Sequence, residues 1–271
     1  MKITFANFRK DPFFFFKYFT AQMLIMMVLG FLCKDLVSSE LSLNLNHLLV
    51  LPLAVVFGLQ LPVALHNAVH FNIKPRMLNE IVGEICGFFV LFGMAPFRIS
   101  HVLHHANADD HELDPHPPMG KNFLYFLATT QLNTVRVISN QYFSIHGRSA
   151  KTYSIMGTQM AAYYVGLALR AFIWWKVLGP TYFVAFYLPA YLTNLVVFAH
   201  INWATHKTME DGSVEIVNLN HNLYYKTVNF LGAGAYYHLN HHLKPNLYDP
   251  SKYEAPVAKK PKLCLVEEIS A

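Results

Sequence analysis

Four long apolar segments constrain the fold of this chain more than any other feature of its sequence. They cover residues 18–33, 47–65, 159–178 and 181–199. A helix needs about 20 mostly apolar residues to cross a bilayer, and each segment approaches that length. The composition agrees, because only 14% of the residues are charged, whereas soluble domains carry roughly 25%. The sequence predicts an all-α integral membrane protein that forms one domain over residues 1–271.

The order of the segments predicts two helical hairpins. Gly179-Pro180 is a tight-turn signal between the third and fourth segments, and a short polar loop separates the first two. The apolar stretch 81–96 is too short to span, so we expect a re-entrant or interfacial helix there. Two hairpins place both termini on one side, together with a helical cap of residues 66–157 and 200–257. Because most lysines and arginines fall on that side, we expect it to be cytoplasmic.

Charge and cysteine spacing exclude several classes of function. The formal net charge of +5 is modest, and no Lys/Arg run resembles a nucleic-acid patch. Cys33, Cys86 and Cys264 lie far apart and form no CxxC motif. This spacing argues against a disulfide framework and against an iron–sulfur centre.

Histidines recur close to the ends of the apolar segments. The second segment leads directly to an HxxxH motif, and two HxxHH motifs follow later in the chain. Residues three or four apart share one face of a helix, so each motif directs its imidazoles the same way. A further histidine follows the fourth segment. The candidate metal ligands are His66, His70, His101, His104, His105, His206, His238, His241 and His242.

Nine nitrogen donors are too many for one metal ion. A structural zinc site takes four ligands, and a catalytic one leaves a position open. The set suits two ions, each with four or five protein ligands and with open positions for a small ligand. Imidazole binds zinc, copper, iron or nickel, so the ligands alone leave the metal undecided.

Four other residues are expected around the ligands. Asn202 lies one helical turn before His206, where its amide could hold a metal-bound water. Asp114 is expected to accept the second N–H of a ligand histidine, whereas its acidic neighbours, such as Asp109, are expected to be solvated. His200 and His221 are expected to orient a ligand or bind a carboxylate rather than bind metal.

The motifs follow the order HxxxH, HxxHH, NxxxH and HxxHH. Between the second and third, His104-His105 is followed by Asp114-Pro115-His116, and the last motif lies in the stretch GAYYHLNHH at residues 234–242. This combination resembles the membrane-bound fatty acid desaturase/hydroxylase superfamily over about residues 66–256, most closely the acyl-lipid and acyl-CoA desaturases. The first motif departs from the eukaryotic acyl-CoA branch, because it has three residues between its histidines rather than four. Asn67 stands there in place of an acidic residue.

The resemblance implies that the nine histidines hold a non-haem diiron centre, with Asn202 as a water-mediated ligand. It implies an O2-dependent oxidoreductase of fatty acid metabolism, a desaturase that inserts a double bond into a fatty-acyl chain of a lipid. Hydroxylation or ketonisation of a fatty acid or a carotenoid is the alternative within the same superfamily. The chain has no GxGxxG, flavin-type motif or cysteine cluster. Electrons would therefore come from an external donor: a ferredoxin, a rubredoxin-like protein or a cytochrome.

Two readings from other classes remain open at this point. A membrane zinc hydrolase would need three or four of the histidines and an acid/base carboxylate such as Asp114. It leaves about five clustered histidines unexplained. A metal transporter would place its histidines within the spans rather than at their ends.

Overall fold

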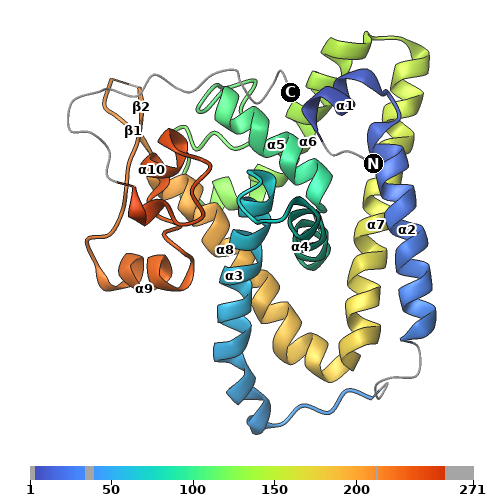
Figure 1. The fold of residues 1–271 in the computed structure, drawn as a ribbon, viewed down its shortest axis with the longest axis vertical. Helices are drawn as coiled ribbons and strands as arrows, with labels where there is room; N and C mark the ends of the chain where they lie inside the picture. Colours follow the sequence, from blue (N-terminus) through green and yellow to red (C-terminus); the bar gives the residue numbers. More distant parts are fainter. Residues whose placement is uncertain (1–3, 34–39, 212, 254–271) are drawn as a thin grey trace.

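The computed structural model describes residues 4–33, 40–211 and 213–253, and most of them are helical (Figure 1). Strands β1 (His206–Thr208) and β2 (Val214–Ile216) pair antiparallel, with His206 opposite Ile216. The helices are α1 (Phe5–Lys10), α2 (Phe14–Leu32), η1 (Leu45–Val50), α3 (Leu51–Val69), α4 (Arg76–Phe89), α5 (Met94–Ala106), α6 (Phe123–His146), α7 (Ala150–Tyr182), η2 (Phe183–Tyr187), α8 (Leu188–Thr205), α9 (Leu223–Leu231), α10 (His238–Leu243) and η3 (Pro250–Lys252).

Among the described residues, three helical stretches are long and apolar enough to cross a membrane: Phe14–Leu32, Leu45–Val69 and Ala150–Thr205. The last one contains α7, η2 and α8, and its backbone is not helical at Gly179, where φ is 68° and ψ is 163°. Glycine adopts this φ without the steric cost that other residues meet. Figure 1 shows α7 and α8 running in opposite directions on either side of this break, so the predicted turn at Gly179-Pro180 is confirmed.

Helices α4 and α5 form a bent pair rather than one straight helix. Their axes differ by 97° across a short break, and the pair counts as a fourth span only if it is read as one broken helix. Side chains of the α7–η2 region bind carbonyls at the end of α4: Trp174 donates to Phe88 O at 3.3 Å and Tyr187 to Phe89 O at 2.7 Å. These bonds satisfy carbonyls that the end of a helix leaves without partners. The bend agrees with the re-entrant segment expected at residues 81–96.

Helices α3 and α8 lie against each other and bring their histidine-bearing ends together. A Cβ on Gly58 of α3 would lie only 2.4 Å from Ala190 O of α8, so the contact requires a glycine. Both helices run the same way in Figure 1, opposite to α2 and α7. Helices α5 and α10 lie near their carboxyl ends, and α1 lies at the same end of the molecule.

The chain end is not part of this description. Residues 254–271, which include Cys264 and the C-terminus expected in the cytoplasm, lie outside the described residues.

Candidate metal centre

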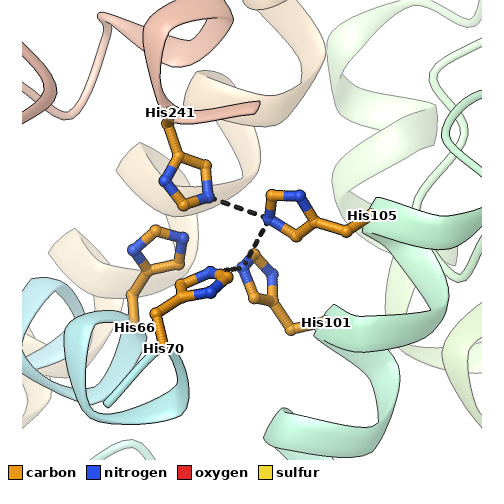
Figure 2. Close-up of side chains that lie close together, drawn as sticks. All are labelled: His66, His70, His101, His105 and His241. Carbon is orange, nitrogen blue, oxygen red and sulfur yellow. Dashed lines mark hydrogen bonds between the residues drawn. The ribbon is translucent and has the colours of Figure 1, made fainter. Parts of the chain in front are cut away.

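Five of the predicted ligands form one group, which we call the five-histidine group. It contains His66 from α3, His70 at the C-terminal cap of α3, His101 and His105 from α5, and His241 from α10. Each ring offers one nitrogen, and these nitrogens all lie within 4.8 Å of one another. Figure 2 shows the five rings directed toward one another from the three helices.

The nitrogen distances in this group fit a metal ion better than hydrogen bonds. His105 Nε2 lies 3.0 Å from His101 Nε2 and 2.9 Å from His241 Nε2. A neutral ring nitrogen either donates or accepts, so protons cannot satisfy both contacts. Two nitrogens that bind one ion at right angles, each at about 2.1 Å, lie about 3 Å apart.

The other four predicted ligands form the four-histidine group: His104 from α5, His206 at the start of β1, and His238 and His242 from α10. Their offered nitrogens also lie within 4.8 Å of one another. His238 Nε2 is 3.1 Å from His206 Nε2 and 3.2 Å from His242 Nε2. His104 Nε2 is buried and has no hydrogen bond within the described part of the chain, which leaves its lone pair for an ion. The structure therefore brings the nine histidines together as two sets, one of five and one of four.

Two carboxylates hold histidines of the four-histidine group. His104 Nδ1 lies 2.9 Å from Asp114 Oδ1, so Asp114 accepts a hydrogen bond from one of the nine histidines. His206 Nδ1 lies 2.9 Å from both carboxylate oxygens of Asp109. A carboxylate accepts only, so each Nδ1 carries the proton and each Nε2 keeps its lone pair.

The expectation that Asp109 is solvated is wrong, because its side chain is only 12% exposed. After α5 ends, Asp109 adopts φ 66° and its backbone N–H donates to Asp114 Oδ2 at 2.8 Å. This turn directs the Asp109 carboxylate toward His206. A run of acidic residues directly after a histidine motif is the sequence signal that could have pointed to it.

Burial determines the charge state of the histidines on α10. It lowers the pKa of His238, His241 and His242 well below the usual value, and the neighbouring histidines lower it further. Burial by itself would raise the pKa of Asp114, but His104 and the backbone N–H of His116 outweigh it, and the net pKa is lowered. The neutral imidazole is the form in which histidine binds a metal ion, and the α10 histidines have it. Burial alone would lower the pKa of His104, but the Asp114 carboxylate outweighs this effect, and the net pKa of His104 is raised instead.

The structure brings Asn202 to the site but neither His200 nor His221. Asn202 donates to His116 O at 2.7 Å and lines a pocket with ligands of both groups. His200 is two residues away, about 200° around α8, and its Nδ1 lies 2.6 Å from the hydroxyl of Tyr236. His221 is exposed, with its ring against Tyr225. Neither histidine belongs to a ligand group, because each faces the aromatic residues around α9.

His116 also lies at the site, although the sequence analysis names it only as part of the Asp114-Pro115-His116 stretch and assigns it no role. Its ring lies 5.9 Å from that of His104, and its Nδ1 is 3.2 Å from Thr134 Oγ1. Burial, together with the neighbouring His104, lowers the pKa of His116 to about 4. A neutral His116 stands beside the four-histidine group without belonging to it.

Two neighbouring cavities at this site share lining residues. A pocket of about 60 Å³ borders ligands of both groups, and a larger cavity of about 450 Å³ lies between α6, α7 and α8. His116, Phe198 and Asn202 line both. Tyr163 and Tyr164 line only the larger of these two cavities. A mostly apolar cavity thus lies beside the pocket that histidines of both groups line, an arrangement suited to metal-dependent chemistry on a hydrophobic substrate.

Comparison with known proteins gave one match. The family model described as "Fatty acid desaturase" matches residues 42–250, which include all nine histidines and both carboxylates. No curated protein and no solved structure matches the chain.

Proposed function

The chain belongs to the fatty acid desaturase family, and we propose that it is a membrane oxidoreductase that inserts a double bond into a fatty-acyl chain of a lipid. The reaction would use O2 and two electrons from an external donor. The observation that carries the proposal is that histidines of both groups line a pocket that shares three lining residues with a larger cavity of mostly apolar walls.

The residues around the ligands have distinct tasks in this reaction. Two iron ions, held by the five-histidine and four-histidine groups, would supply O2 activation and removal of hydrogen from an unactivated C–H bond. Asp114 and Asp109 hold the Nδ1–H of His104 and His206, so that Nε2 of each faces the metal position. Phe198 and the neutral His116, which line both cavities, would position the acyl chain relative to the histidine groups.

We infer a topology in which α2, α3, α7 and α8 cross the membrane as two hairpins. The alternating directions of these helices in Figure 1 support it. The histidine face and both termini would be cytoplasmic, with the cap of residues 66–157 and 200–257 above the spans. A ferredoxin, a rubredoxin-like protein or a cytochrome would deliver electrons at this face. A reporter fused to the C-terminus that is active only in the periplasm or lumen would contradict this orientation.

The test is metal content of the anaerobically purified protein, paired with lipid analysis of cells that express it. Two irons per chain and a new unsaturated acyl chain are expected. Two irons with an oxygenated lipid would instead assign the chain to the hydroxylase or ketolase branch. One zinc with no oxidised product would contradict the proposal and favour a hydrolase. Cells that express His104→Ala serve as the control and should lack the new lipid.

A further inference from the structure

The large cavity contains polar groups that an unsubstituted alkyl chain would leave without partners. Asn194 lies within α8, lines the cavity and is only 7% exposed. Its side-chain amide makes no hydrogen bond to any residue that the structure describes. One turn earlier, Tyr191 also lines the cavity, and its hydroxyl has no hydrogen-bond partner in residues 4–33, 40–211 or 213–253. Asn194 is buried and Tyr191 is partly buried, and polar groups inside an apolar segment usually have hydrogen-bond partners, so these two require an explanation.

Another polar pair in the same cavity shows the contrast. Gln131 Nε2 donates to the hydroxyl of Tyr163 at 2.8 Å, so that hydroxyl has a partner from the protein itself. Asn194 and Tyr191 have no such arrangement, although they lie on one helix. Polar side chains inside membrane spans are costly and mark functional sites. The missing partner is therefore expected to come from the occupant of the cavity.

Water does not readily supply that partner, because the cavity opens toward lipid. Tyr164, Leu192 and Val196 line the cavity and are 51%, 56% and 42% exposed. They belong to α7 and α8, within a stretch long and apolar enough to cross a membrane. The surroundings of this opening are acyl chains, so a lipid is the natural occupant.

The position of Asn194 indicates which part of the lipid it would meet. Asn202, at the junction with the metal-site pocket, lies eight residues further along α8, which is about 12 Å at about 1.5 Å per residue. Tyr191 lies about 16 Å from the same point. If the lipid headgroup lies at the histidine face, the reacting carbon lies between the headgroup and Asn194. Asn194 and Tyr191 therefore face the part of the chain beyond that carbon.

We propose that the lipid substrate carries an oxygen function, a hydroxyl or carbonyl group, in the part of its chain beyond the oxidised carbon, and that Asn194 and Tyr191 bind this group. An amide offers both donors and an acceptor, and a phenol hydroxyl offers one of each, so either oxygen function can be satisfied. The inference rests on the proposed function only in taking the large cavity as the substrate site.

The experiment measures binding to the metal-loaded protein in detergent, without O2 or an electron donor. The probes are stearic acid and a series of its hydroxy derivatives, with the hydroxyl moved stepwise from the terminal carbon toward the carboxyl. At least one hydroxy derivative is expected to bind roughly 10-fold more tightly than stearic acid. Asn194→Leu should abolish this preference, and the gentler Tyr191→Phe, which removes a single oxygen atom, should reduce it.

Leu195→Met is the matched control, because Leu195 lines the same cavity and the change adds no hydrogen-bonding group. It should shift the binding of both kinds of probe by similar factors. Equal affinity for stearic acid and every hydroxy derivative, a preference retained in both variants, or no binding of any probe would each overturn the inference. Since binding is read without turnover, failure here is distinct from failure of the proposed reaction, which the lipid analysis tests.

Discussion

The two histidine groups differ in what holds their rings. In the four-histidine group, His104 and His206 each meet a carboxylate through Nδ1, at 2.9 Å. In the five-histidine group, none of His101, His105 and His241 has a hydrogen bond to a carboxylate of the described residues, and His241 Nδ1 is buried without a partner there. Two rings of the four-histidine group are thus held by carboxylates, whereas, in the described part of the chain, His101, His105 and His241 of the other group are not.

If both groups bind metal as proposed, this difference would make the two metal positions unequal. A carboxylate on Nδ1–H fixes the tautomer and orientation of the ring and makes Nε2 a stronger donor. The five-histidine group has one more ligand, but its rings depend on the packing of α3, α5 and α10. We therefore expect the four-histidine group to hold its ion more tightly, and the five-histidine group to lose its ion first on treatment with a chelator.

The largest effect is expected from the loss of one ligand in either group. His241→Ala and His104→Ala should each lower turnover below detection, because both ions are needed, while the protein still inserts into the membrane. Each variant should also lose iron from a different group. Iron per chain and the lipid product are the measurements, and full turnover in either variant would contradict that ligand assignment.

Asp114→Asn tests the carboxylate that binds His104 Nδ1, and it leaves all nine histidines unchanged. An amide can still accept a hydrogen bond from His104 but brings no charge, so the affinity of the four-histidine group for metal should fall about 10- to 100-fold. A chelator titration followed by iron analysis measures this change. Asp110→Asn is the control, because that carboxylate is exposed and, among the described residues, accepts hydrogen bonds only from the backbone of Glu112 and Leu113. If the four-histidine group binds metal equally tightly in Asp114→Asn, the carboxylate does not strengthen this group, and the proposed difference in metal affinity between the groups is wrong.

Much of this centre could be predicted because motif spacing is a local property of the chain. On α5 the spacing of His101, His104 and His105 determines which rings share a face, and the apolar segment before His66 determines where the helix ends. Asp114 followed from the general rule that ligand histidines donate their second N–H. How these local pieces divide into a group of five and a group of four depends on tertiary packing, which the spacing does not contain.

Asp109, Asn194 and His200 show what the sequence could not supply. Asp109 depends on a left-handed turn after α5, and an acidic loop is solvated in most proteins. Asn194 is one polar residue in an apolar segment, and only the folded chain places it at a cavity. His200 points away from the ligand groups, whereas His206 belongs to one of them. Helical spacing could not predict this difference, because α8 ends at Thr205, between the two residues.

Asp109→Asn should have a smaller effect than Asp114→Asn. The Asp109 side chain is 12% exposed and that of Asp114 is fully buried, so water can replace part of the lost interaction with His206. We expect a decrease in metal affinity near 10-fold, the lower end of the range for such partners. The same chelator titration measures it. A larger loss than in Asp114→Asn would mean that His206, rather than His104, is the more dependent ligand.

The smallest effect is expected at a histidine outside both groups. His146 ends α6, and its ring packs 4.7 Å from that of Tyr142, far along the chain from every ligand motif. His146→Ala should leave iron content and the lipid product close to those of the unchanged protein, with any cost confined to packing against Tyr142. A cost of about 1 kcal/mol in thermal unfolding is the ordinary size for such a change. If His146→Ala lost iron instead, the nine histidines would not be the complete metal centre, and α6 would contribute to it as well.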